Sequence, residues 1–429
     1  MDIRDDQNHV FNISLAKRTG LYQSLNPETT KYRGKNLYRI VMAFFTLYIG
    51  VNGVILNVHG VYYWTNNMSL SIDYFWNGIY TLFICYSLSV IVHYSDDIWN
   101  CLSITCYGFT SHSLRDRHIL DRWRERSVFI TTIITFTYFV SAFIFYFSSL
   151  VLWNYRVEVK NRDGSVSNYR YNVLNYYLFV SEETYNAQYY MFNMVECLGM
   201  VNFLIALFVF DVLAVTLCLA IRCQMQMISI AFESVGYTSL GDHHLSLVDC
   251  RGEKKNLPNI QNLMYDQIKT IIMDHQAVMR KYGAILKIFK GALLSQFVIL
   301  SMVLIVIWFC FIMSFSSDER FNSSRIITIK IFSAIPITVF KLFGTCYLFG
   351  NIHDQKDSII FALYSSNWPE MDMKCKKLIL LAMKMNNANQ KKLKFTRTKI
   401  INLEMFFKTI RDSYSILSVL VNYIKNMNE

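Results

Sequence analysis

One long apolar run decides what this chain can fold into. Val128–Trp153 carries no charged side chain along its whole length. The hydrocarbon core of a bilayer holds no water to satisfy free backbone groups, so a helix that crosses it needs about 20 mostly apolar residues. A soluble helical protein is the alternative, but only 17% of the 429 residues are charged, against about a quarter in soluble proteins. The sequence therefore predicts an integral membrane protein.

Similar runs predict further membrane spans. They cover residues 38–58, 74–94, 191–222, 291–315 and 326–350, and a weaker, more polar run covers 401–424. The segment 1–37 is polar and has no apolar stretch typical of a cleavable signal peptide. The first run is therefore expected to act as its own insertion signal. We predict an all-α membrane protein with seven transmembrane helices.

The basic residues predict which way the chain crosses the membrane. Cytosolic loops of membrane proteins are enriched in Lys and Arg. With a cytosolic N-terminus, 30 of the 42 Lys and Arg residues fall in cytosolic segments and 7 in extracellular ones. The C-terminus is then extracellular, and the sequons at Asn67 and Asn322 lie in outside loops as expected glycosylation sites. This orientation argues against a G-protein-coupled receptor, whose N-terminus is outside.

The sequence has no pattern that indicates catalysis or metal binding. All ten cysteines lie in predicted spans or cytosolic segments, so no extracellular disulfide is expected. No Cys/His cluster has the spacing of metal ligands, and neither a phosphate-binding loop nor a Ser/His/Asp set is apparent. We therefore expect no enzymatic activity, catalytic residue, metal, cofactor or nucleic-acid partner.

The segment between the fourth and fifth spans contains a heptad seam. Its members alternate spacings of four and three residues: Met264, Ile268, Ile271, His275, Val278, Tyr282, Ile285 and Phe289. This pattern predicts a long amphipathic helix that runs into the fifth span. Such a seam either joins subunits or packs within its own chain, and the spacing leaves both open.

Two other connecting segments have predicted structure. Between the sixth and seventh spans, 359–364 predicts a short amphipathic helix that Pro369 ends, and 376–383 begins a second helix that is too short to span. We expect the second helix to lie against the heptad helix or at the membrane surface. In the loop 154–190, Asp163 and Gly164 between alternating apolar residues predict a β-hairpin, with a plain connector as the alternative.

The seventh span is too polar for a helix surrounded by lipid. Lys408, Arg411 and Asp412 interrupt it, and ionisable groups within a span usually face a bundle interior or water. Ser415, Val419 and Asn422 recur on one helical face. Around a shared axis, this face would form a hydroxyl ring, a hydrophobic constriction and an amide ring of a pore. An inner helix packed within one subunit is the alternative.

Four short stretches near the C-terminal end resemble the signature of insect odorant receptors. They are Ala362–Trp368, Lys376–Leu381, Asn402–Phe406 and Ser413–Ser415. The resemblance implies a cytosolic segment 1–37, a six-helix bundle 38–350 that includes the cytosolic helical loop 223–290, a cytosolic anchor region 351–400, and a pore-lining seventh helix with a short tail, 401–429. In that family the anchor region holds subunits together, which favours the subunit-joining interpretation of the heptad seam.

The resemblance also implies a function. Members assemble with the odorant co-receptor, as a heteromeric tetramer, into an odorant-gated channel for monovalent and divalent cations in the plasma membrane of olfactory sensory neurons. The family's gating valine falls on Val419 and its pore glutamine on Asn422. A gustatory receptor is a related alternative, although the C-terminal stretch 415–423 favours the odorant branch. A secondary transporter is disfavoured because no internal repeat is apparent.

In this family a volatile, mostly apolar odorant binds between the outer halves of spans two, three, four and six. Apolar contact is expected to dominate such binding, with the serines or Tyr80 meeting a ligand oxygen. The residues that the resemblance places there are Tyr80, Phe83, Ser141, Phe145, Ser148, Met194, Leu198, Val201, Phe332 and Ile335.

Overall fold

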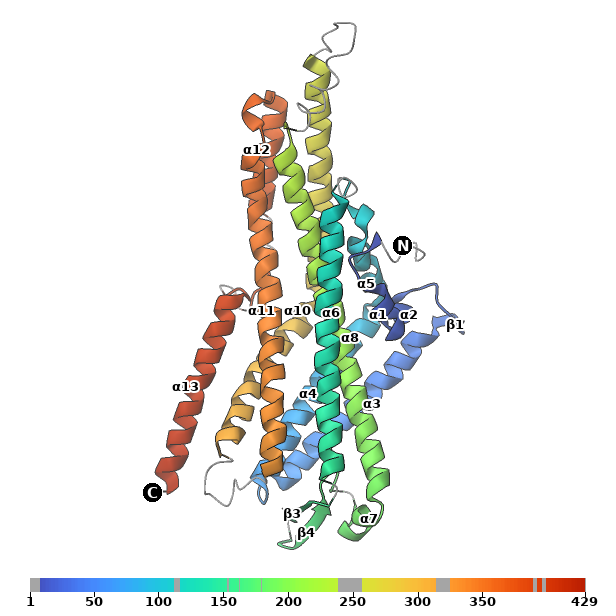
Figure 1. Cartoon of the computed structure of the whole chain (residues 1–429), viewed down its shortest axis with the longest axis vertical. Helices are drawn as coiled ribbons and strands as arrows, with labels where there is room; N and C mark the ends of the chain where they lie inside the picture. The colour runs from blue at the N-terminus through green and yellow to red at the C-terminus, as the bar shows by residue number, and fades with distance from the viewer. Residues whose placement is uncertain are drawn as a thin grey trace.

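In the part of the chain that the computed structural model describes, seven long helices run lengthwise (Figure 1). The structure describes residues 8–111, 116–152, 154–161, 163–178, 180–237, 257–313, 325–388, 392–395 and 399–428. The long helices are α3 (Leu37–Tyr63), α4 (Met68–His93), α6 (Arg117–Val151), α8 (Tyr189–Ser234), α10 (Leu257–Met313), α11 (Arg325–Ser365) and α13 (Leu403–Asn428). Within the described residues, six of them are long and apolar enough to cross a membrane. The seventh, α13, is interrupted by more charged residues than any of the apolar runs in these six helices.

Short elements connect the long helices. They are α1 (Ile13–Arg18), α2 (Leu21–Leu25), β1 (Lys31–Tyr32), β2 (Lys35–Asn36), α5 (Ser95–Leu102), η2 (Ser103–Thr105), η3 (Tyr107–Phe109), α7 (Glu182–Ala187), η5 (Trp368–Glu370) and α12 (Met373–Ala388). Asn36 shows how sequence sets one boundary, because its side-chain oxygen accepts from the backbone N–H of Tyr38 at 2.9 Å and so caps the start of α3.

The helix α8 is the centre of the bundle. It contacts α4, α6, α10 and α11, and most of its residues from Leu204 to Phe232 are buried. A helix that is apolar on all sides is stable only when other helices or lipid surround it. A cavity inside the bundle is therefore lined by α8 together with the side chains of α4, α6, α10 and α11 that point toward it.

The predicted hairpin in the loop 154–190 is confirmed. Strands β3 (Arg156–Lys160) and β4 (Val166–Arg170) pair antiparallel, with Arg156 opposite Arg170. Gly164 in the turn has φ +85°, a conformation that favours glycine. The inner face of the hairpin packs on a tyrosine-rich cluster, so the hairpin covers the adjacent ends of α3, α4 and α8 (Figure 1).

The heptad seam lies inside its own chain. Ile268, Ile271, Val278 and Tyr282 are each 0% exposed, because α10 packs against α8, α11 and α12. The prediction that this seam joins subunits is therefore wrong for its buried residues, which have no surface left for a partner. The helix itself is confirmed: α10 has 57 residues, or about 85 Å at about 1.5 Å per residue, far more than the ~30 Å hydrocarbon core.

The segment after the sixth span differs from its prediction in one respect. The residues 359–364 do not form a separate helix, because α11 continues without a break from Arg325 to Ser365. The second predicted helix is present as α12, which packs against α10 as expected. Both lie at the end of the bundle opposite the hairpin (Figure 1).

Candidate functional site

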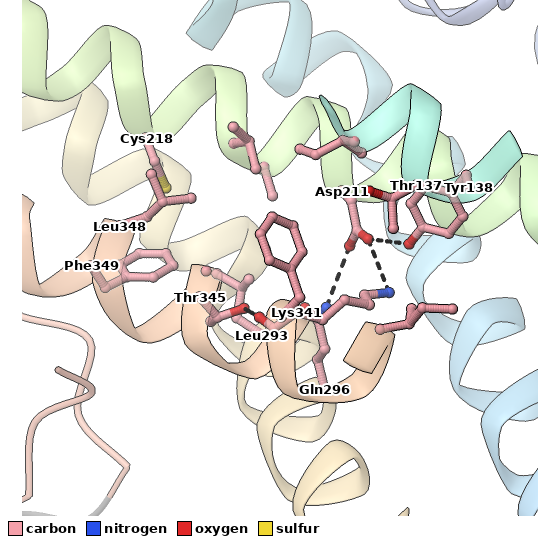
Figure 2. Close-up of a pocket in the computed structure, with 16 residues that line it drawn as sticks. Thr137, Tyr138, Asp211, Cys218, Leu293, Gln296, Lys341, Thr345, Leu348 and Phe349 are labelled. Atoms are coloured by element: carbon pink, nitrogen blue, oxygen red, sulfur yellow. Dashed lines mark hydrogen bonds and ion pairs between the residues drawn. The ribbon is translucent and has the colours of Figure 1, made fainter. Parts of the chain in front are cut away.

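A buried ion pair joins two central helices in the middle of the bundle. Lys341 on α11 places its Nζ 2.9 Å from Oδ2 of Asp211 on α8, and the two side chains are only 7% and 13% exposed. The hydroxyl of Tyr138 on α6 donates to the same carboxylate, and Nε2 of Gln296 on α10 lies 3.4 Å from Oδ1 (Figure 2). One carboxylate thus connects four transmembrane helices.

The ammonium of Lys341 has further partners on the side of α4. Its Nζ donates to the Tyr80 hydroxyl at 3.0 Å. It also lies 5.6 Å from the ring centroid of Tyr80 and 5.7 Å from that of Tyr138. Aromatic faces attract cations, and the attraction grows where water is excluded. The ring faces and the carboxylate together compensate the cost of burying this charge.

Two cavities meet at this ion pair. The hairpin-side cavity is lined by Trp76, Asn77, Tyr80, Tyr138, Ser141, Met200, Phe203, Leu204, Leu207, Ile337, Thr338 and Lys341. The central cavity, further from the hairpin, is lined by Ile134, Thr137, Tyr138, Asp211, Ala214, Val215, Cys218, Leu293, Gln296, Ile337, Phe340, Lys341, Gly344, Thr345, Leu348 and Phe349 (Figure 2). Tyr138, Ile337 and Lys341 belong to both linings. An apolar cavity with a few convergent polar groups is the usual form of a small-molecule site.

The structure brings some predicted odorant contacts to the hairpin-side cavity. Tyr80 and Ser141 line it. Phe83 lies behind Tyr80, with which its ring stacks at 6.0 Å between centroids, and is 3% exposed. Ile335 is buried between α11 and α10, beside Val303.

Other predicted contacts lie elsewhere. Val201 lines a third cavity, between α6 and α8. Met194 and Leu198 are 74% and 61% exposed, so they face away from the cavities, contrary to the prediction. The physical reason is that the same turns of α8 turn Asn193 and Glu196 inward. The side chains of Phe145, Ser148 and Phe332 lie outside the described residues.

Sequence reasoning missed the polar residues at the centre of the site. Asp211 lies within the predicted span 191–222 and Lys341 within 326–350. The available signal was that charged residues occur in these otherwise apolar spans, since a charge in a span usually faces the bundle interior and pairs with another. Met200, Phe203 and Leu207 carried no such signal, because apolar residues in a span face lipid or interior equally well.

A second buried carboxylate holds the loop over the hairpin-side end of α8. Glu196 is 0% exposed, and its oxygens accept from the backbone N–H groups of Leu174 at 2.6 Å, Asn175 at 2.8 Å and Tyr176 at 3.1 Å. The Tyr185 hydroxyl donates to it at 2.9 Å. Four donors fix this loop segment, which therefore forms a defined cover.

The predicted pore residues lie on an exposed face of α13. This helix contacts α10 and α11 through a stripe that includes the buried Phe406 and Leu417. Ser415, Val419 and Asn422 lie on the opposite side, where Val419 is 68% exposed and the other two are exposed. Figure 1 shows α13 at the margin of the bundle. Nothing in the described part of the chain covers this face.

The two predicted glycosylation sites differ in what the structure shows. Asn67 precedes α4, and its amide donates to the carbonyl of Lys160 in β3 at 2.8 Å. It lies beside the hairpin. Asn322 falls outside the described residues.

Comparison with known proteins places the chain in a family. A family model described as 7tm Odorant receptor matches residues 107–414. Odorant receptor 2a of Drosophila melanogaster is 25% identical over 179 residues, which are 41% of this chain and 43% of that protein, so the match spans less than half of the relative.

Solved structures support the same fold. The olfactory receptor OR5 of Machilis hrabei superposes with a TM-score of 0.68 at 12% identity, covering 95% of this chain and 97% of that one. The same receptor in complex with eugenol gives 0.64 at 13% identity, covering 96% and 98%. The predicted seven-helix membrane fold is thereby confirmed. Because the family model covers well over half of its length, this chain belongs to the insect seven-transmembrane odorant receptor family.

Proposed function

We propose that this chain is the odorant-binding subunit of a cation channel. A volatile, mostly apolar ligand binds in the hairpin-side cavity, and the chain assembles with the odorant co-receptor in the plasma membrane of olfactory sensory neurons. The observation that carries the proposal is the position of this cavity. It lies between α4, α6, α8 and α11, the spans between which the family resemblance places the ligand.

The distribution of charge supports the proposed orientation. Basic residues concentrate in the segments that include α12 and the first part of α10, and such segments are typically cytosolic. The hairpin and the loop held by Glu196 are then extracellular. In this orientation the anchor region around α12 lies in the cytosol and the ligand cavity lies nearer the outside.

The exposed face of α13 supports the proposed pore. Ser415, Val419 and Asn422 are polar or small and uncovered by their own chain. A helix with such a face is stabilised when it meets other subunits or water, because exposing polar groups to lipid is costly. A tetramer with the co-receptor would place the four α13 helices around one axis, with Val419 at the constriction.

The test is to record membrane currents from cells that express the chain with and without the co-receptor. Volatile ligands are expected to evoke a non-selective cation current only in cells that hold both. Val419→Ala and Asn422→Asp are expected to change conductance or divalent permeation, whereas Ile416→Ala, exposed on a different face of α13, serves as the control. Currents that both pore variants leave unaltered would contradict the pore assignment.

A further inference from the structure

One hydroxyl in the hairpin-side cavity is held ready to donate a hydrogen bond. The Tyr80 oxygen accepts from Lys341 Nζ at 3.0 Å. An ammonium has no lone pair, so the phenolic hydrogen cannot point back at it. Tyr80 donates to no other described residue, and its side chain lines the cavity. The hydrogen therefore remains available to a group inside the cavity.

The neighbouring donors on α4 and α6 are already committed. Tyr138 donates to Asp211, and Ser141 donates to the carbonyl of Thr137 at 2.8 Å. The amide of Asn77 donates twice to Asp73, to its backbone carbonyl at 2.8 Å and to its side chain at 3.2 Å. Tyr80 thus differs from the other hydroxyl and amide groups that these two helices bring to the cavity.

The position of Tyr80 depends on the ion pair behind it. Asp211 fixes Lys341 Nζ at 2.9 Å, and Lys341 in turn fixes the Tyr80 oxygen. Phe83 stacks against the Tyr80 ring and restricts its rotation. A hydroxyl whose oxygen accepts from a cation is also a stronger donor, because hydrogen bonds in a chain polarise one another.

We propose that the hairpin-side cavity selects ligands that carry a hydrogen-bond acceptor oxygen, such as ketones and esters, and that Tyr80 donates to that oxygen. Lys341 and Asp211 are positioning residues, which act by fixing Tyr80. The rest of the ligand lies against Met200, Phe203 and Leu204. This inference rests on the proposed function of the cavity as the ligand site, and it adds the chemical class that the site prefers.

The test measures equilibrium binding directly, without channel opening. The full-length chain in lipid nanodiscs is titrated with tritiated methyl ketones from 2-hexanone to 2-decanone and with the alkanes of the same length. Tyr80→Phe removes only the hydroxyl. Loss of one hydrogen bond to a polarised donor is expected to raise the ketone Kd about tenfold and to leave the alkane Kd unchanged. Comparing variants cancels the different partitioning of the two probes into lipid.

Two further variants sharpen the result. Tyr190→Phe, on an exposed position of α8 outside the cavity, is the matched control and is expected to change neither Kd. The double variant Asp211→Asn with Lys341→Met leaves no unpaired charge. Because Lys341 lines the cavity, the readout is the ratio of the two Kd values, and ketone binding is expected to weaken several-fold more than alkane binding. A merely structural role of the pair would change both Kd values together.

The outcomes separate this inference from the proposed function. Equal changes in ketone and alkane binding on Tyr80→Phe, or no saturable ketone binding in the unaltered chain, would overturn the acceptor preference. Acceptor-selective binding without any odorant-evoked current would overturn the channel role and support the inference. Current evoked equally well by ketones and alkanes would support the channel role and overturn the acceptor preference.

Discussion

The buried Asp211–Lys341 pair makes a prediction about stability that can be worked from its contacts. Lys341→Met removes the cation and leaves a carboxylate inside the bundle. Removing one partner of a buried pair costs about 3–5 kcal/mol. The Tyr138 hydroxyl and Gln296 still donate to Asp211, so we expect the lower end, about 3 kcal/mol. Asp211→Asn leaves Lys341 with Tyr80 and two ring faces, and a similar loss is expected.

The double variant separates a specific pair from two independent residues. Asp211→Asn with Lys341→Met leaves no buried charge, and the new amide oxygen still accepts from Tyr138. We expect a loss of about 1 kcal/mol, the net value of one hydrogen bond. Independent effects would instead add to about 6 kcal/mol. The expected coupling between the two positions is therefore about 5 kcal/mol, which lies above the usual range for contacting residues because burial is nearly complete.

The assay is thermal unfolding of each full-length variant in detergent, followed as the monodisperse fraction that remains after heating. The single variants are expected to lower Tm by roughly 5 °C and the double variant by much less. Arg411→Met, Asp412→Asn and their combination form the control cycle, because those side chains are 75% and 55% exposed and 3.9 Å apart. Exposed pairs contribute about 0–1 kcal/mol. A double variant at Asp211 and Lys341 that loses as much as both single variants together would refute the reasoning.

Three other predictions follow from separate contacts. Glu196→Gln keeps one acceptor oxygen for four donors, so amide hydrogen exchange at Leu174–Tyr176 is expected to accelerate while exchange in β3 and β4 stays unchanged. Unaltered exchange at Leu174–Tyr176 would contradict the assigned role of Glu196. Asp372 lies before α12 and accepts from the Cys375 N–H at 2.8 Å, so Asp372→Ala is expected to cost about 1 kcal/mol in thermal unfolding. The Cys375 thiol and N–H lower the pKa of Asp372. The stabilisation by the Asp372 carboxylate is therefore present above the usual carboxyl pKa near ~3.9 and is lost as pH falls through the lowered pKa. If Asp372→Ala still costs as much below that pH, the assigned role of the carboxylate is contradicted. Gly236 has φ +87°, and a Cβ there would meet Asn367 Cβ at 2.9 Å. Gly164 has φ +85° but no neighbour within 4 Å, so Gly236→Ala is expected to reduce Tm more than Gly164→Ala. Equal reductions in Tm would show that backbone strain alone decides the loss of stability.

Much of the fold could be predicted because it depends on local patterns. The apolar residues from Val128 to Val151 lie in α6, since a helix satisfies the backbone of a single segment in lipid by its own hydrogen bonds. Asp163 and Gly164 predicted the hairpin since the turn needs a positive φ. The continuation of α11 to Ser365 was not predictable in this way, because it depends on contacts with other helices. Gln355 lies 3.5 Å from Ser229 of α8, and Asn386 of α12 donates to the carbonyl of Lys356 at 3.1 Å.

The site was less predictable because it depends on which face of each helix turns inward. Tyr80 and Ser141 were found through the family resemblance, whereas Met194 and Leu198 were placed on the wrong side of α8 for the cavities. In a span, apolar residues occur on both the lipid face and the interior face, so periodicity does not distinguish them. Glu196 would have been the better guide, since a carboxylate in that stretch must turn toward donors.

Charged residues within spans show why burial has to be known before such a signal is interpreted. Lys341 and Asp211 are 2.9 Å apart and almost wholly buried, so their charges stabilise an interior contact between α8 and α11. Arg411 and Asp412 are equally unexpected in a hydropathy profile, yet they are exposed and 3.9 Å apart. The first pair satisfies its charges inside the chain; the second requires water or another subunit. The same sequence feature therefore marks the wall of two interior cavities in one helix pair and an uncovered surface in α13.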